Sequence, residues 1–202
     1  MNASDTRTAI LDTAVELASV RGLEELSIGG LASTVKMSKS GLFAHFGSKQ
    51  ELQLATVAEA WEIFESEVLL EPTFGRQDVL AGLLERWLSF YEREVFAGGC
   101  FFVLSAVELA NRQDAVSKAL VDAIDRQLAA LEAAVRSAIE SGELPARKDP
   151  GQTAFALHSV LINADSLFQV RHDRAVFDDA RATIGELLAE PPRPRRSTST
   201  VP

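Results

Sequence analysis

The sequence has little or none of what several protein classes require. Cys100 is the only cysteine among 202 residues, which excludes an intramolecular disulfide and a cysteine-rich zinc site. No stretch approaches the roughly 18 consecutive apolar residues of a membrane-spanning helix. The N-terminus MNASDTRTAI has an early acid and no apolar segment typical of a secretory signal. These absences predict a cytoplasmic protein with no membrane partner.

Motifs for catalysis, metals and cofactors are also missing. The histidines His45, His158 and His172 lie far apart, and none belongs to an H-x-x-x-H pair. The glycine pairs 29–30 and 98–99 have neither the G-x-G-x-x-G nor the G-K-S/T form of a phosphate-binding loop. The sequence therefore predicts no catalytic residue, no metal site and no cofactor, and the chain is not expected to be an enzyme.

Positive charge is scarce, because the formal net charge is −9. Its distribution matters more than its sum. Residues 61–202 hold 15 basic and 22 acidic side chains, whereas residues 36–49 hold three lysines, a histidine and no acid. An acidic body with a small basic patch can still bind phosphates through that patch. The overall charge thus does not exclude a nucleic-acid partner.

Apolar residues recur at helical spacing along almost the whole chain, and no segment shows the alternation of a strand. Glycine and proline fall between the periodic segments, where helices are expected to stop. We predict an all-α protein of about nine helices, at residues 6–20, 27–35, 38–46, 48–70, 76–96, 100–112, 114–141, 151–171 and 174–189. Residues 191–202 lack apolar periodicity and are predicted to be a disordered tail.

Serines precede three of the early helices. Ser27, Ser38 and Ser48 can each accept a hydrogen bond from a free amide of the first helical turn. Ser48-Lys-Gln-Glu51 also has the S-x-x-E form of a capping box. Gly22 suits the left-handed position that ends the first helix. These local signals favour short helices joined by tight turns.

The segment 27–46 would form two short helices that bury little surface alone and must pack against the first and fourth helices. The apolar residues expected to make this contact are Ile28, Leu31, Ala32, Val35, Met37, Leu42 and Phe46. The side chains left outward on the second of the two helices are small, polar or basic: Lys39, Ser40, Gly41, Ala44 and His45. Such a face suits a helix that enters a DNA major groove. The pattern alone also fits an ordinary helical hairpin with a solvated surface.

The run MSKSGLFAHFGSKQEL resembles the recognition helix and following cap of the tetracycline-repressor (TetR/AcrR) family of bacterial transcriptional regulators. The resemblance continues back through RTAILDTAVELASVRGLEELSIGGLAS and covers roughly residues 6–58. It implies an N-terminal helix-turn-helix DNA-binding domain at residues 1–50 and a helical ligand-binding and dimerisation domain at residues 51–190. It further implies a homodimer, most often a repressor, that binds a palindromic double-stranded DNA operator and is released by a small-molecule effector.

The resemblance also implies roles for single residues. Ser38, His45 and Lys49 would bind phosphates, and Ser27 would lie close to the DNA backbone. The residues nearest the base edges would be Lys39, Ser40 and Gly41.

The sequence departs from the family pattern at three places. Phe43 stands where the family usually has a tyrosine, so a hydroxyl contact to phosphate is lost while packing is retained. Lys36 occupies a turn position that often holds glycine, and there it adds positive charge. Gly29-Gly30 weakens the second helix by about 1 kcal/mol per residue relative to alanine.

Aromatic residues are concentrated between residues 60 and 110. They predict either a ligand pocket between helices, with a few polar groups, or a plain hydrophobic core. The candidate ligand-binding residues are Trp61, Phe64, Trp87, Phe90, Tyr91, Phe101, Phe102, Asn163 and Phe168. For Cys100, a small buried side chain is the preferred interpretation.

Helix 151–171 is apolar around most of its circumference, so it should be buried. With helix 174–189 it could form a four-helix interface with a second copy, or it could be an internal core helix. The candidate interface residues are Phe155, His158, Leu161, Ile162, Asp165 and Phe168. Asp165 and His158 could instead reach the ligand.

A second function remains open from the residues. Phe43 and the weakened helix at Gly29-Gly30 would also be found in a helical ligand-binding or protein-interaction module that has lost DNA binding.

Overall fold

The computed structural model describes residues 3–70 and 79–189, and within these ranges it contains helices and no strand. The helices are α1 (Ala3–Arg21), α2 (Ile28–Thr34), α3 (Lys39–Phe46), α4 (Lys49–Phe64), the π-helix η1 (Glu65–Leu69), α5 (Val79–Glu92), α6 (Phe101–Glu108), α7 (Ala115–Glu140), α8 (Pro150–Arg171) and α9 (Ala175–Leu188). The predicted all-α class is confirmed. The predicted tail, 191–202, and the predicted start of the fifth helix lie outside the described residues.

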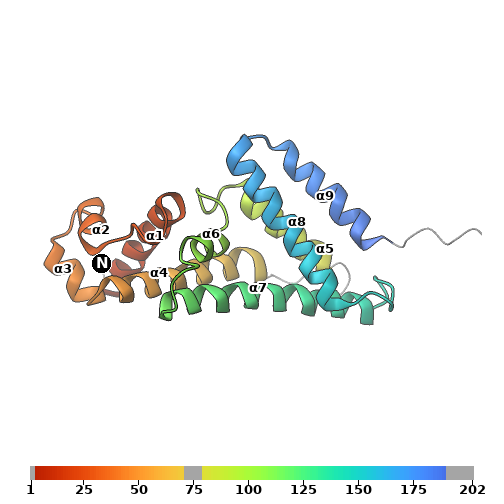
Figure 1. Cartoon of the computed structure of the whole chain (residues 1–202), viewed down its shortest axis with the longest axis horizontal. Coiled ribbons are helices and arrows are strands. Elements are labelled where there is room, and N and C mark those ends of the chain that lie inside the picture. Colours follow the sequence, from red (N-terminus) through yellow and green to blue (C-terminus); the bar gives the residue numbers. More distant parts are fainter. Residues whose placement is uncertain (1–2, 71–78, 190–202) are drawn as a thin grey trace, which may run out of the picture.

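Helices α4 and α7 run along the molecule and connect its two ends (Figure 1). Helices α1, α2 and α3 gather around the first half of α4, and we call these elements the N-terminal unit. At the other end, α5 and α8 pack across the second half of α7, and α9 packs on α8. Helix α6 lies between the two groups and packs on α7 and α1. Because α4 begins in one group and ends in the other, residue 50 lies inside a continuous helix rather than in a linker.

The predicted caps of the N-terminal unit are present. Gly22 adopts φ +94° directly after α1, as the left-handed C-cap requires. Ser38 accepts a hydrogen bond from the Gly41 amide at 3.0 Å, and Ser48 accepts one from the Glu51 amide at 3.1 Å. These bonds satisfy free amides of the first turns of α3 and α4 and fix where each helix starts.

The predicted extent of the fourth helix is confirmed, because α4 runs to Phe64 and the π-helix η1 continues it to Leu69. Two other predicted boundaries are wrong. The helix predicted to reach residue 96 ends at Glu92, because Glu94 has φ +54° and the Val95 amide turns back to the Phe90 carbonyl. The helix predicted at 100–112 is shorter and ends at Glu108.

The capping box predicted at Ser48 is present only in half. The Ser48 amide donates to the Phe46 carbonyl at 2.7 Å, so the Glu51 carboxylate does not take that amide. A complete capping box occurs instead at the start of α7, between Asp114 and Ser117.

A single cluster of buried apolar side chains extends from α1 to α9. No helix within the described ranges is long and apolar enough to span a membrane. Likewise, the described part of the chain holds no group of three histidine, cysteine or acidic side chains placed to bind a metal ion.

Candidate nucleic-acid interface and helical core

The turn between α2 and α3 is built from backbone bonds and one left-handed residue. The Met37 amide donates to the Ala32 carbonyl at 2.9 Å, and the Val35 amide donates to the Leu31 carbonyl at 2.9 Å. Lys36 has φ +55° between them. This is the Schellman arrangement, in which the left-handed position favours glycine. The sequence-based expectation that Lys36 occupies a turn position suited to glycine therefore agrees with the backbone.

Two buried side chains hold α3 against the core of the N-terminal unit. Leu42 and Phe46 are 0% and 3% exposed, and both belong to the hydrophobic core. The guanidinium of Arg7 in α1 lies 5.1 Å from the centre of the Phe46 ring, which adds a cation–π contact. Gly47, at φ +68°, ends the helix and turns the chain into α4.

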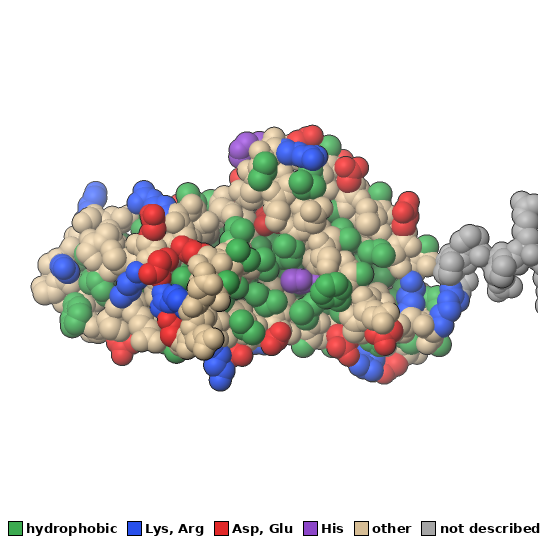
Figure 2. Space-filling view, viewed as in Figure 1, with side chains coloured by type: hydrophobic (Ala, Val, Ile, Leu, Met, Phe, Trp, Pro, Cys, Tyr) green, Lys and Arg blue, Asp and Glu red, His purple; other side chains and the backbone are tan. Residues whose placement is uncertain are grey.

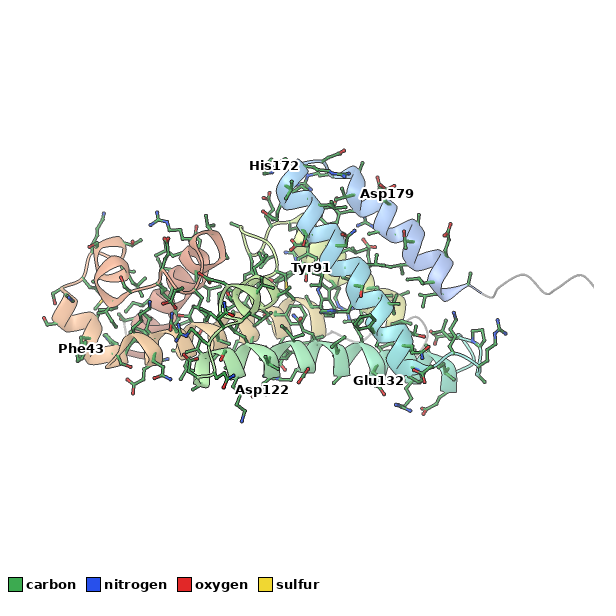
Figure 3. All side chains as sticks on the ribbon, viewed as in Figure 1. Phe43, Tyr91, Asp122, Glu132, His172 and Asp179 are labelled. Carbon is green, nitrogen blue, oxygen red and sulfur yellow. The ribbon has the colours of Figure 1, made fainter. Side chains whose placement is uncertain are left out.

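The opposite side of α3 is exposed and has no acidic side chain. Lys39, Ser40, Phe43 and Ala44 all lie on it. Phe43 is 54% exposed and lies at the tip of the N-terminal unit (Figure 3). The exposed ring beside a cation and a hydroxyl, with no acid on the same side, makes this side of α3 a candidate contact surface.

The remaining predicted DNA-binding residues lie around this exposed side. Gly41 is half-buried, and a Cβ there would lie 3.0 Å from the Ser38 hydroxyl oxygen. His45 is also half-buried, with its ring centre 6.2 Å from that of Phe46. Ser27 caps α2 by accepting from the Gly30 amide at 3.2 Å. The structure thus brings all of these residues to one end of the molecule.

Lys49 differs from the other cations of this surface because it already has an anionic partner. Its ammonium donates to the Glu24 carbonyl at 2.5 Å and to the Glu24 carboxylate at 3.2 Å. The pair lowers the pKa of Glu24, chiefly through the hydrogen bond from Lys49. A phosphate would have to compete with Glu24 for Lys49.

The aromatic side chains predicted to line a pocket pack against one another in the interior. We call this set the aromatic core: Trp61, Phe64, Trp87, Phe90, Tyr91, Phe96, Phe101 and Phe102. Phe64 is central, with ring-centre distances of 4.9 Å to Trp87, 5.7 Å to Phe90 and 5.9 Å to Phe102, all edge-to-face. Phe168 is buried apart from this set, against Phe177 at 5.1 Å, and Asn163 is exposed. The expectation that Asn163 would lie with the aromatic residues is therefore wrong.

Polar side chains are buried beside the aromatic core. Trp87 donates its indole N–H to the Tyr91 hydroxyl at 2.9 Å, and His158 lies 3.4 Å from the Gln127 amide oxygen. Burial lowers the pKa of His158 and favours its neutral form. The Trp61 indole N–H and the Gln127 amide nitrogen are buried without a hydrogen-bond partner among the described residues. A buried donor without a hydrogen bond costs free energy of folding. Both groups could therefore donate to a hydrogen-bond acceptor on a bound molecule.

Asp165 of α8 is a buried carboxylate that contacts the start of α6. It is 1% exposed and accepts a hydrogen bond from the Cys100 amide at 2.7 Å through one oxygen, while the other oxygen has no partner among the described residues. Burial raises the pKa of Asp165 to about 6 and that of the Cys100 thiol to about 11. Cys100 is thus a buried, protonated thiol, in agreement with the interpretation from sequence.

The predicted interface residues of α8 divide between its two sides. His158, Leu161, Asp165 and Phe168 are buried within their own subunit, so for these four the expectation of an outward-facing contact is wrong. The physical reason is that they recur at helical spacing on the side of α8 that packs on α7 and α9.

The outward side of α8 is also apolar. Phe155 is 68% and Val170 is 80% exposed, and Ile162 is half-buried. Hydrophobic side chains gather on the face of the molecule formed by α6, α7 and α8 (Figure 2). Helix α8 therefore has an internal side, to which the core-helix alternative applies, and an exposed apolar side, for which contact with a second copy stays a prediction.

Several residues that shape these sites were not identified from the sequence. Gln127, Glu24, Glu108 and Arg112 all make contacts with residues more than 30 positions away. Each lies on a helix or turn where a charged or polar residue is ordinary, so no local pattern marks it.

Comparison with known proteins finds the same family at both ends of the chain. The family described as "Bacterial regulatory proteins, tetR family" matches residues 10–56, and "Tetracyclin repressor-like, C-terminal domain" matches residues 77–184. The chain is 29% identical over 159 residues to the HTH-type transcriptional regulator AcrR of Shigella flexneri, covering 71% of this chain and 69% of that protein.

Solved structures share the fold. A TetR transcriptional regulator from Chloroflexus aurantiacus matches with a TM-score of 0.81 and 22% identity, over 91% of this chain and 93% of that one. AibR, solved in complex with isovaleryl coenzyme A and operator DNA, matches with a TM-score of 0.70 and 22% identity, over 90% and 98% of the two chains. These relatives are regulators of transcription, which confirms the prediction of a regulator rather than an enzyme.

Proposed function

Because the chain belongs to the tetR family of bacterial regulatory proteins and is a transcriptional regulator, we propose that it represses transcription as a DNA-bound homodimer that a small molecule releases. The observation that carries the DNA-binding part is the exposed side of α3. This side offers a cation, a hydroxyl and apolar groups but no acid, from Lys39, Ser40, Phe43 and Ala44. The opposite side of α3 is buried through Leu42 and Phe46. Such a helix can enter a major groove and contact base edges.

The proposed roles of the surrounding residues follow from their places. Ser27 and Ser38 lie before α2 and α3, and His45 lies in the last turn of α3. These three would contact phosphates, as would Lys36 in the turn and Lys49 at the start of α4. Gly41 allows close approach of the α3 backbone. Two copies of α3 would lie in successive major grooves, about 34–36 Å apart, on a near-palindromic operator. We place the DNA-binding region at residues 1–50 and the regulatory region at 51–190, in the cytoplasm where the chromosome lies.

The homodimer is proposed on the exposed apolar side of α8. Phe155, Ile162 and Val170 leave this side unpartnered in one subunit, and a second copy could cover it. We expect Phe155→Glu to convert a dimer into a folded monomer in light scattering at micromolar concentration, because it places a charge in a buried contact. Val20→Glu is the matched control, since Val20 is 62% exposed on α1, outside this face. A wild-type protein that is monomeric at this concentration would refute the dimer.

The effector site is proposed beside the aromatic core. Its support is two buried donors that have no hydrogen-bond partner in the described part of the chain, the Trp61 indole and the Gln127 amide, which come from the neighbouring helices α4 and α7. A ligand that accepts from them would push α4 away from α7 and change the spacing of the two α3 helices. It would act only through its different affinities for the DNA-bound and released arrangements.

A gel shift with the DNA upstream of the chain's own gene tests the central proposal. We expect a complex at nanomolar protein that a competitor of unrelated sequence does not remove. The alternative, a ligand-binding or protein-interaction module without DNA binding, would give no specific complex. Phe43 and the Gly29-Gly30 pair of α2 are the features that favour this alternative.

A further inference from the structure

Four charged side chains form a continuous series from the start of α7 to the start of α4. Arg112 donates to the carboxylate of Asp114, the N-cap of α7, with an Nε–Oδ2 distance of 2.7 Å, and its terminal nitrogen also contacts the Glu24 carboxylate. The other oxygen of Glu24 lies 3.2 Å from the Lys49 ammonium. Acidic and basic side chains lie side by side at this junction in Figure 2. Charges of alternating sign thus connect the regulatory region with the N-terminal unit.

Glu24 is held in place between the two cations by its backbone. The turn after α1 donates its Leu23 and Glu24 amides to the Glu108 carboxylate of α6, at 2.8 and 3.3 Å. On the other side, buried Gln53 of α4 donates to the Leu23 carbonyl at 2.7 Å. The turn is therefore held by α6 and by α4, which keeps the Glu24 backbone beside Lys49 and Arg112 while its carboxylate is free to rotate.

We propose that Glu24 competes with DNA phosphate for Lys49, and that Arg112 sets the strength of this competition from outside the N-terminal unit. The proposal rests on the proposed DNA-binding function, in which Lys49 contacts a phosphate. An ammonium held by a carboxylate neutralises less phosphate charge than a free one. When Arg112 shares the Glu24 carboxylate, it offsets part of that negative charge and loosens the hold on Lys49.

The exposure of the pairs makes such an exchange feasible. The side chains of Lys49 and Glu24 are 43% and 49% exposed, and those of Arg112 and Asp114 are 32% and 31% exposed. Ion pairs at this exposure contribute little to stability, so a phosphate can displace Glu24 without unfolding anything. Arg112 lies between α6 and α7, so a rearrangement of these helices would change its distance from Glu24 and thereby change DNA affinity.

Matched glutamine substitutions test the competition. Glu24→Gln and Glu25→Gln change the net charge equally, and Glu25 is an exposed neighbour on the same turn. We expect Glu24→Gln to tighten operator binding about two- to five-fold more than Glu25→Gln, the range that an exposed ion pair supports. The slope of log K against log salt should steepen by about 0.9 for each added phosphate contact. Equal effects of the two variants would overturn the proposal.

Arg112 is tested by its dependence on Glu24. Arg112→Gln should weaken operator binding in the wild-type chain and have no such effect when Glu24 is already glutamine. Lys118→Gln is the control for loss of a nearby exposed cation. Two outcomes would contradict the proposal: Arg112→Gln weakens binding equally in both backgrounds, or it weakens binding no more than Lys118→Gln does. In either case Arg112 would act only through the overall charge of the protein.

A measurement without DNA separates this proposal from the proposed function. The pKa of the Glu24 carboxyl, followed by NMR in the full chain, should be lowered in the wild type and return toward its ordinary value in Lys49→Met. An unchanged pKa would overturn the pairing itself. A normal pKa response with no operator binding by any variant would instead refute the proposed function.

Discussion

The two ends of helix α4 lie in opposite surroundings. At its start, Lys49 is exposed, and within the described residues its side chain donates to the carbonyl and the carboxylate of Glu24. At its end, Phe64 is 1% exposed and surrounded by Trp87, Phe90 and Phe102. One continuous helix therefore joins a solvent-exposed, charged surface to a buried, aromatic interior.

This difference decides what a mutation at each end should change. Groups at the exposed end can exchange a protein partner for water or phosphate at little cost. Groups in the interior cannot, because their alternative is a cavity or an unpaired polar atom. We therefore expect substitutions at the first end to alter DNA binding without altering stability, and substitutions in the interior to alter stability first.

The largest effect that separates the two regions is expected from Lys39→Ala combined with His45→Ala. Loss of a base contact costs about 1–3 kcal/mol, so the double variant should lose operator binding by roughly a hundredfold or more. Its thermal midpoint and its dimeric state should match the wild type, since Lys39 is exposed and His45 half-buried. Fluorescence anisotropy with labelled operator and circular dichroism measure the two quantities.

The matched control removes the same two residue types elsewhere. Lys118 and His172 are exposed on α7 and after α8, and asparagine tolerates the left-handed backbone of His172 at φ +54°. Lys118→Ala with His172→Asn should bind as the wild type does. Nanomolar operator binding by the Lys39/His45 variant would contradict the assignment of α3 as the DNA-contacting helix.

The junction between the two regions is expected to be rigid. A Cβ at Gly98 would lie 1.7 Å from the Ser19 carbonyl oxygen of α1, so backbone must move in Gly98→Ala. We expect this variant to lose about 2–3 kcal/mol of unfolding free energy, as overpacked sites do. Gly185→Ala in α9, where a Cβ meets nothing within 4 Å, should instead gain about 1 kcal/mol. Urea titrations compare the two, and equal stabilities would contradict the close contact.

The contrast between the regions also explains what the sequence could predict. Ser27, Ser38 and Ser48 act on amides three residues ahead, so the sequence alone located α2, α3 and the start of α4. The pairing of Glu24 with Arg112 spans 88 positions, and no local pattern encodes it.

Helix α8 shows a second limit of sequence reasoning. Its apolar residues extend around the helix, so periodicity could not tell which of Phe155 and Leu161 faces outward. That assignment depends on where α7 and α9 pack, which is a property of the whole fold.

In the interior, the buried carboxylate of Asp165 should make stability depend on pH. Its pKa is raised from an ordinary 3.8 to about 6, so the folded state holds its proton more tightly than the unfolded state does. Stability should then fall as pH rises from about 4 to about 6 and remain lower above that range. Asp165→Asn should remove this loss and gain about 1–3 kcal/mol at pH 8, with no gain at pH 4.

Thermal unfolding across this pH range checks the Asp165 prediction. Asp179→Asn on the exposed surface of α9 is the control and should follow the wild-type curve. A parallel pH profile for Asp165→Asn and wild type would show that Asp165 is not the group responsible.

The smallest effect is expected at Phe43, the exposed aromatic residue at the tip of the N-terminal unit. Phe43→Tyr adds one hydroxyl, which could donate to a DNA phosphate, and one such hydrogen bond contributes about 0.5–1.5 kcal/mol. Operator binding should tighten roughly two- to ten-fold, with an unchanged salt slope because no charge is added. Stability should not change, since the ring stays exposed. Replacing the contacted phosphate by an uncharged methylphosphonate should remove the gain. Equal affinity of the two proteins would show that the ring at position 43 does not lie within hydrogen-bond distance of a DNA phosphate.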